Sequence, residues 1–273
     1  FLAKQKLFTE CADGNTNFII NKDEAFGQRL LGTLRGRIWQ YGFSSDADVC
    51  VMRHELSRNG SQAIIKIPQG VINITSALVG RHNLYNIMAA VAFGVSEGLE
   101  PASIKKGIEA VYSVPGRLER IDAKKGFSVF VDYAHTDDAL KNVLESLRLV
   151  LHNGRIITVF GCGGDRDKGK RPKMGRVASA FSDYCFVTSD NPRSEEPEEI
   201  IEQIIAGMEK NNFEVVCDRF KAIQKALTMA AEGDFVLVAG KGHETYQTIK
   251  DRTFAFDDKS VVLKILSLPE KHV

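Results

Sequence analysis

The side chains best suited to chemistry gather in four short polar clusters, all in the second half of the chain. The richest cluster, residues 161–171, reads GCGGDRDKGKR. Its glycines let the backbone approach a ligand closely, and its Arg and Lys side chains can donate charge-assisted hydrogen bonds to carboxylate or phosphate oxygens. We therefore expect Arg166 and its basic neighbours to bind an anion, with a solvated basic loop as the structural alternative.

Known glycine-rich nucleotide motifs do not describe this cluster. The chain contains no G-x-x-x-x-G-K-[ST] sequence, and residues 161–171 do not follow G-x-G-x-x-G. The cluster therefore gives no support for a dinucleotide cofactor.

A second cluster, TSDNPR at residues 188–193, combines acceptors with a guanidinium group. Arg193 could hold a carboxylate through two parallel hydrogen bonds, while Asp190 and Asn191 could accept hydrogen bonds from an ammonium group. Asp-Asn-Pro is also a favourable turn sequence, so a purely structural turn remains an alternative. Together the side chains match the zwitterionic end of an amino acid.

The other two clusters are DYAHT at residues 132–136 and AGKGHE at residues 239–244. Asp132 and His135 could bind a nucleotide ribose or phosphate, whereas Thr136 and the two acids after it suit the cap and first turn of a helix. In AGKGHE, a cation, an imidazole and a carboxylate stand with two glycines. A tight turn needs only one glycine, so we expect a binding role there.

Each cluster follows a short apolar segment, and amphipathic segments separate these apolar ones. The alternation runs through FSVFVDYAH, DDALKNVLESLRLVL, RIITVFGCGG, RVASAF, YCFVTSDNP, EEIIEQIIAGMEK, FEVVCD, RFKAIQKALTMAA and DFVLVAGKG. Such alternation predicts an α/β fold, with a parallel sheet covered by helices on both faces. Ligands bind beyond the carboxyl ends of such strands, which is where the clusters stand.

A Pro115-Gly116 pair marks the expected boundary between residues 1–114 and residues 115–273. The first half reads as strands NTNFIINKDE and RIWQYGFSS around a helix EAFGQRLLGTL, then short strands with a hairpin at Asn59-Gly60, then a helix HNLYNIMAAVAFGVSEGL. The sequence starts at Phe1 within a helix-like stretch. We expect that an amino-terminal part is missing from it.

The composition is that of an ordinary globular protein. The formal net charge is +1, from 36 Lys and Arg against 35 Asp and Glu, which gives no reason to expect nucleic acid or a membrane as a partner. Five widely spaced cysteines without a C-x-x-C pair favour reduced thiols. The sequence also has no apolar run of transmembrane length and no signal-peptide pattern at its start, so we expect a cytoplasmic protein.

Spaced motifs along the whole chain closely resemble those of the Mur ligase family. They are GRHNLYN from Gly80, PGRLE from Pro115, DYAHT from Asp132, FGCGGDRDKGKRPKMG from Phe160, TSDNPRSE from Thr188 and AGKGHE from Ala239. The DNPR form is similar to that of members that use meso-diaminopimelate, and lysine-adding members usually lack this Arg. The resemblance implies part of a central ATPase domain followed by a Rossmann-like carboxy-terminal domain.

Position by position, the resemblance also implies roles for individual residues. Contacts to diaminopimelate would come from Arg166, Asp190, Asn191, Arg193, Gly240 and Glu244, with Pro192 shaping them. The family lines a nucleotide site between its two domains at positions matching Asn83, Asn86, Arg117, Asp132 and His135. Lys4 aligns with the family's carbamylated lysine, whose added carboxylate helps to hold Mg²⁺ beside the γ-phosphate of ATP.

The implied reaction is ATP-dependent addition of meso-diaminopimelate to UDP-MurNAc-L-Ala-D-Glu during peptidoglycan synthesis, through an acyl phosphate. Two departures from the family pattern stand out. Its UDP-binding domain and P-loop are absent, so we expect these residues alone to be inactive, and Asp137 replaces a frequent proline. Alternatives are a lysine-adding ligase, a folylpolyglutamate synthetase, a non-catalytic amino-acid-binding module or, more remotely, a Rossmann-type oxidoreductase.

Overall fold

The structure is a computed structural model, which describes residues 1–10 and 12–268. The chain divides into two compact units, Phe1–Tyr112 and Ser113–Val273. The division falls in residues 110–118, a stretch without helix or strand that also contains the boundary expected after residue 114.

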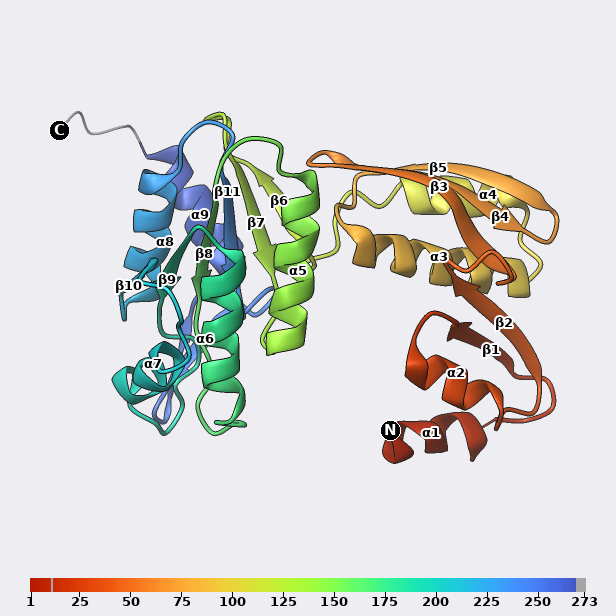
Figure 1. Cartoon of the computed structure of the whole chain (residues 1–273), viewed down its shortest axis with the longest axis horizontal. Coiled ribbons are helices and arrows are strands. Elements are labelled where there is room, and N and C mark those ends of the chain that lie inside the picture. The colour runs from red at the N-terminus through yellow and green to blue at the C-terminus, as the bar shows by residue number, and fades with distance from the viewer. Residues whose placement is uncertain (11, 269–273) are drawn as a thin grey trace. The chain divides into compact units, whose positions relative to one another are not determined.

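The amino-terminal unit contains a five-stranded sheet in the order β1-β2-β3-β4-β5 (Figure 1). Its elements are α1 (Leu2–Thr9), β1 (Asn17–Asn21), α2 (Ala25–Leu31), β2 (Arg37–Gly42), β3 (Val49–Ser57), β4 (Gly60–Ile67), β5 (Gly70–Ser76), α3 (Arg81–Ser96) and α4 (Pro101–Glu109). The first three strands are parallel, and β3, β4 and β5 form an antiparallel meander. Helix α3 packs its apolar side on this sheet, with Leu84, Met88 and Val91 fully buried.

The hairpin expected at Asn59-Gly60 is confirmed, one residue away from where the sequence centred it. Ser57 pairs with Gly60, so the turn itself is formed by residues 58 and 59. Gly60 has φ +140°, and a Cβ there would lie 2.1 Å from the carbonyl oxygen of Ser76. The glycine is therefore required by the close approach of β5.

The carboxy-terminal unit is built on a six-stranded sheet in the order β10-β9-β8-β11-β7-β6. All neighbouring strands are parallel except β6, which is antiparallel to β7. Its elements are β6 (Glu119–Asp122), β7 (Ser128–Asp132), α5 (Asp137–Val150), β8 (Ile156–Phe160), α6 (Lys170–Phe181), β9 (Tyr184–Val187), α7 (Pro197–Ile205), β10 (Phe213–Val215), α8 (Arg219–Met229), β11 (Phe235–Ala239), β12 (Tyr246–Ile249), β13 (Arg252–Ala255) and α9 (Asp258–Ser267).

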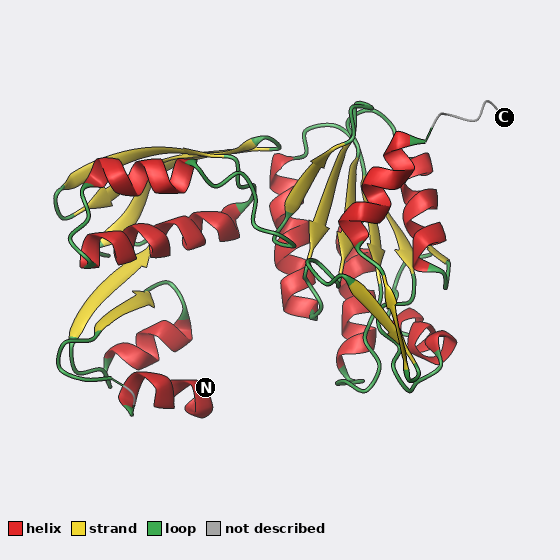
Figure 2. Cartoon of the chain, turned by 180° about the vertical axis from the view of Figure 1, so that it is seen from behind, coloured by secondary structure: helices red, strands yellow, loops and turns green. Residues whose placement is uncertain are grey.

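Helices cover both faces of this sheet, as the alternating sequence predicted. Figures 1 and 2 show α5 and α6 on one face and α8 and α9 on the other. Strands β7, β8 and β11 are buried at every position, which explains their largely apolar sequences. Thr136 caps α5 as expected, because its Oγ1 accepts a hydrogen bond from the Ala139 amide at 3.2 Å. The α/β fold is confirmed.

Strand register places the four polar clusters at one edge of the sheet. Ala239 at the end of β11 pairs with Asp132 at the end of β7, and Phe160 at the end of β8 pairs with Val187 at the end of β9. Since these four strands are parallel, their carboxyl ends meet at this edge, and every cluster begins there.

Several element boundaries differ from the sequence expectation. Helix α6 begins at Lys170, so the last two basic residues of the 161–171 cluster belong to a helix and not to a loop. Helix α7 ends at Ile205, where Gly207 lies so close to Pro172 that a Cβ would be 1.8 Å from its carbonyl oxygen. We did not expect α4 as a separate helix, nor α9 or the β12–β13 hairpin, from the sequence. No helix in the described ranges is both long and apolar enough to span a membrane.

Candidate functional site

Asn191 lies at the centre of the polar network beyond the carboxyl ends of β9 and β11. Its Nδ2 donates to Oε2 of Glu244 at 2.8 Å, and its Oδ1 accepts from the Thr248 amide at 2.9 Å. The ammonium group of Lys241 lies 3.2 Å from the same Oδ1. The network thus joins the TSDNPR and AGKGHE clusters, which are about 50 residues apart in the sequence.

Asp190 and Gly240 are adjacent in this network. The side chain of Asp190 accepts a hydrogen bond from the Asn191 amide at 2.7 Å, and the residue is 8% exposed. Gly240 has φ +115°, and a Cβ there would lie 2.8 Å from Oδ2 of Asp190. The glycine therefore leaves room for the carboxylate, which an alanine at this position would displace.

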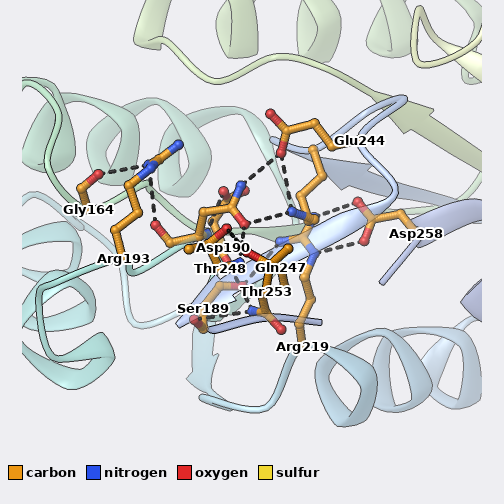
Figure 3. Close-up of polar contacts among 12 residues, drawn as sticks. Gly164, Ser189, Asp190, Arg193, Arg219, Glu244, Gln247, Thr248, Thr253 and Asp258 are labelled. Carbon is orange, nitrogen blue, oxygen red and sulfur yellow. Dashed lines mark hydrogen bonds and ion pairs between the residues drawn. The ribbon is translucent and has the colours of Figure 1, made fainter. Parts of the chain in front are cut away.

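Arg193 is held in a left-handed backbone conformation, with φ +53°, by the β12–β13 hairpin. Its amide donates to Thr248 O at 3.1 Å, and its carbonyl accepts from the Lys250 amide at 2.5 Å. Its Nη1 donates to Gly164 O at 2.8 Å, as Figure 3 shows, which leaves Nη2 unpaired among the described residues. The guanidinium group is therefore fixed at one end and available to a carboxylate at the other.

Pro192 and Arg166 connect this site to the glycine-rich cluster. Pro192 is buried, and a Cβ at Gly164 would lie 1.9 Å from its carbonyl oxygen, so the two loops are in direct contact. The side chain of Arg166 is exposed, and its Nη1 donates to the Asp165 carbonyl at 3.0 Å. Asp165 accepts from the Ser194 hydroxyl at 2.5 Å, and this bond lowers the pKa of the Asp165 carboxyl.

A buried ion pair that the sequence analysis missed joins α6 to the loop after β9. Arg171 has no exposed side-chain surface and donates to both oxygens of Glu195, at 2.9 and 2.8 Å. It also donates to Gln203 on α7. Hydrogen bonds from Arg171, together with the Asp165 amide, lower the pKa of Glu195 from 4.5 to about 2. The sequence carried no sign of this pair, because Arg171 looked like one more ligand-binding cation.

We expect the Glu195 pair to make stability depend on pH in acid. Because the pKa of Glu195 is lowered on folding, its stabilisation should be complete above pH 4.5 and disappear as the pH falls towards about 2. Glu195→Gln should lower the free energy of unfolding at neutral pH by about 3 kcal/mol, since the buried Arg171 would lose the carboxylate with which it is paired. Urea unfolding at a series of pH values measures both effects. Equal pH dependence of the two proteins in this window would contradict the prediction.

A second group of side chains lies beyond β7, at the same edge of the sheet. The ring of Tyr133 is 4.6 Å from that of His135 and 5.1 Å from that of His243, and the Arg117 guanidinium lies 5.5 Å from it. His135, His243 and Arg117 are exposed. Nδ1 of His135 is 2.9 Å from Tyr133 O, so Nε2 is the nitrogen left to a ligand. The group can stack on a base and contact a phosphate.

Asp132 is buried, unlike the exposed side chains around Tyr133 that could contact a bound molecule directly. It is 4% exposed, and its oxygens accept from the Leu118 and Ala134 amides at 2.6 and 2.7 Å. Burial raises the pKa of this carboxyl, although both hydrogen bonds favour its charged form. Through these bonds Asp132 fixes the PGRLE turn, which carries Arg117, against the end of β7.

The remaining expected residues lie in the amino-terminal unit. Asn83 is buried, donating to Val79 O at 2.8 Å and accepting from Asn86 at 3.1 Å. Lys4 is exposed on α1. The described residues contain no group of three or more His, Cys, Asp or Glu side chains that would hold a metal by themselves. The roles of Asn83 and Asn86 in a nucleotide site and of Lys4 in a magnesium site remain predictions.

The β12–β13 hairpin is the main functional element that we did not predict from the sequence. Gln247 Nε2 donates to Asp190 O at 2.6 Å, so side chains and backbone of β12 together hold residues 190–193 in place. Behind them, Arg219 and Asp258 form an ion pair with no exposed side-chain surface. Only the spacing of alternating residues in YQTIKDRTFA could have suggested a hairpin, and that pattern is weak.

The arrangement presents opposite charges from a rigid frame. Glu244 uses Oε2 for its two bonds within the network, and its Oε1 has no partner among the described residues; Figure 3 shows that oxygen pointing away. Arg193 supplies an unpaired guanidinium nitrogen, and Arg166 an exposed one. A ligand that carries both an ammonium and a carboxylate group suits such a frame.

Two family models match most of the chain. The model for the Mur ligase middle domain matches residues 1–94, and the model for the Mur ligase, glutamate ligase domain matches residues 116–242. The first match lies within the amino-terminal unit and the second within the carboxy-terminal unit.

Similar proteins cover both units. A UDP-N-acetylmuramoyl-L-alanyl-D-glutamate--2,6-diaminopimelate ligase of Syntrophomonas wolfei is 41% identical over 268 residues, covering 97% of this chain and 55% of the relative. A ligase of the same name from Solibacter usitatus is 44% identical over 270 residues, covering 97% and 54%. A solved structure of that name is 32% identical, with a TM-score of 0.64, and covers 97% and 55%. The chain spans about half the length of these curated relatives.

Proposed function

The chain belongs to the Mur ligase family, and we propose that the whole protein is an ATP-dependent ligase that adds meso-diaminopimelate to UDP-MurNAc-L-Ala-D-Glu. The observation that carries this proposal is a pair of charged-group atoms at the sheet edge without a hydrogen-bond partner among the described residues, the outer guanidinium nitrogen of Arg193 and Oε1 of Glu244. Relatives at 41–44% identity that are named for this reaction support it.

The chemistry of diaminopimelate matches these charges. The end of the molecule away from the reacting amine carries a carboxylate and an ammonium group, whereas the corresponding end of lysine has no carboxylate. We propose that Arg193 and Arg166 bind the carboxylate and that Glu244 and Asp190 accept hydrogen bonds from the ammonium. Asn191, Pro192 and Gly240 hold these groups in position.

The described residues also fit an adenine nucleotide. Arg117, Tyr133 and His135 offer a stacking surface and free donors at the ends of the strands, and Asp132 holds the Arg117 turn. We also propose that Asn83 and Asn86 of the amino-terminal unit contact the nucleotide, and that a carbamate on Lys4 would give Mg²⁺ the oxygen ligand it prefers. Bound ATP would supply the phosphoryl group that activates the peptide carboxylate as an acyl phosphate, and Mg²⁺ would neutralise its charge. Attack of the amine on the acyl carbon would then release inorganic phosphate.

No nucleophilic side chain of the protein is needed for this reaction. The chain's part is to orient the amine and to neutralise charge, for which positioned cations and a fixed clamp are sufficient.

We also propose that the protein acts in the cytoplasm, because Cys50, Cys162, Cys185 and Cys217 are all unpaired, as in a reducing compartment. Neither nucleic acid nor a membrane is proposed as a partner.

A ligation assay on the full-length protein tests the proposal. We expect ADP release and tripeptide product with ATP, UDP-MurNAc-dipeptide and meso-diaminopimelate, and no product with L-lysine in its place. Product with lysine would indicate a lysine-adding ligase, and glutamate addition to a folate would indicate a folylpolyglutamate synthetase. Binding of diaminopimelate without ATP turnover would indicate a binding module.

A further inference from the structure

Lys241 is a buried cation within the polar network that has no assigned role. The residue is 0% exposed, and its ammonium group lies 3.3 Å from Oε2 of Glu244 and 3.2 Å from Oδ1 of Asn191. The ring of Tyr246 lies 5.6 Å from the same nitrogen. A buried ammonium is costly unless it is paired, so a position this deep needs a compensating interaction. The carboxylate of Glu244 supplies it.

The orientation of the Asn191 amide follows from the backbone. The Thr248 amide can only donate, so the Asn191 atom 2.9 Å from it must be the oxygen, and Nδ2 must face Glu244. Lys241 donates to that oxygen as well as to Glu244. Both bonds of the ammonium therefore reinforce one orientation of the amide and one placement of the carboxylate.

Oε2 of Glu244 is thus held by two donors, the Asn191 amide and the Lys241 ammonium. With Oε2 held, Oε1 is directed away from the network (Figure 3). If Lys241 were absent, a single neutral hydrogen bond would hold the carboxylate, and Asn191 would lose one of the two donors to its oxygen. Glu244 could then rotate.

We propose that Lys241 is a positioning residue for amino-acid recognition, which locks Asn191 and Glu244 so that Oε1 of Glu244 meets the ligand's ammonium group. This inference rests on the proposed function of the site. Lys241 touches no substrate; it acts through Glu244. Its removal should therefore weaken capture of the amino acid and leave the other two substrates unaffected.

Steady-state kinetics of the full-length enzyme test this role with Lys241→Met, which keeps the length of the side chain but not its charge. We expect KM for meso-diaminopimelate to rise roughly 10- to 100-fold, the usual range for a hydrogen bond to a charged group, with kcat reduced much less. KM for ATP and for the UDP-linked dipeptide should not change. Lys225→Met, at an exposed lysine on α8, is the matched control and should behave as wild type.

A double-mutant cycle separates this role from general packing. If Lys241 acts through Glu244, the double variant Lys241→Met/Glu244→Gln should have a KM for meso-diaminopimelate less than about threefold above that of Glu244→Gln alone. Losses that multiply in the double variant would overturn the proposal, as would an unchanged KM in Lys241→Met. Should Lys241→Met fail to fold, Lys241→Gln, which keeps a neutral donor on a shorter side chain, is put through the same cycle.

A substrate-free measurement distinguishes failure of this inference from failure of the proposed function. The side-chain amide protons of Asn191 should exchange slowly with solvent in wild type, and at least about tenfold faster in the Lys241 variant, by nitrogen-15 NMR. If the wild-type enzyme does not use diaminopimelate, the proposed function is wrong and the amide signal alone decides the role of Lys241. Identical exchange of the Asn191 amide protons in wild type and the Lys241 variant would refute the positioning role of Lys241.

Discussion

Replacing Asp258 with alanine should lower the free energy of unfolding of the carboxy-terminal unit by about 3–5 kcal/mol. Asp258 accepts two hydrogen bonds from Arg219, at 2.8 and 2.7 Å, and neither side chain has exposed surface. The variant would leave a buried guanidinium without its counter-charge. Urea unfolding followed by circular dichroism measures the loss, analysed as a separate transition if the two units unfold separately.

The expected loss of stability comes from the buried Arg219 guanidinium, which would have no partner carboxylate, and two comparisons isolate this effect. Glu209→Ala breaks the surface pair with Arg176, in which both side chains are more than 60% exposed, and should cost less than about 1 kcal/mol. Replacing both buried partners, as Arg219→Met with Asp258→Leu, should recover much of the loss. A loss in Asp258→Ala as small as that in Glu209→Ala would show that water reaches Arg219.

Arg219 also links this stability to the site. Its Nη2 donates to the carbonyl of Ala239 at 3.0 Å, and its Nη1 lies 3.5 Å from the carbonyl of Ser189. Ala239 is the last residue of β11 and Ser189 follows the end of β9, and they directly precede Gly240 and Asp190. The buried pair therefore ties the two loops that carry the proposed ammonium acceptors to α8 and α9.

The parallel sheet and the positions of the clusters were predictable because simple physics determines them. Strands buried on both faces are apolar at nearly every position, as FVLVA in β11 and, apart from Thr158, IITVF in β8 are. The end of such a strand is then visible as an abrupt change to polar residues. Parallel pairing brings those ends together, so the sequence order of the clusters was enough to predict that they share an edge.

The contacts within the site were not predictable, because they depend on which charged residues are buried. Lys241, Arg171 and Arg219 have almost no exposed surface, yet lysine and arginine are usually solvated, and nothing in the sequence distinguishes these three. The left-handed conformation of Arg193 likewise arises from pairing with a hairpin more than 50 residues away. Such long-range contacts have no local sequence pattern.

Replacing Arg193 with alanine should lower kcat/KM for meso-diaminopimelate in the full-length enzyme by roughly 30- to 5,000-fold, corresponding to about 2–5 kcal/mol for a truncated charged pair. Arg193 is half-buried and anchored through Nη1 to Gly164 O at 2.8 Å, so its outer nitrogen is already positioned before the ligand binds. Alanine removes that donor without adding bulk. Initial rates at varied diaminopimelate concentration measure the effect.

Selectivity distinguishes a carboxylate clamp from a general loss of activity. Lysine has no carboxylate at the corresponding end, so any residual activity with lysine should be nearly unchanged in Arg193→Ala, and the preference for diaminopimelate should shrink. Arg193→Lys keeps the charge but loses the planar fork, and we expect it to restore only part of the preference. Arg176→Ala, at an exposed arginine on α6, controls for loss of positive charge. Equal losses with both amines would mean that Arg193 shapes the loop and does not bind the carboxylate.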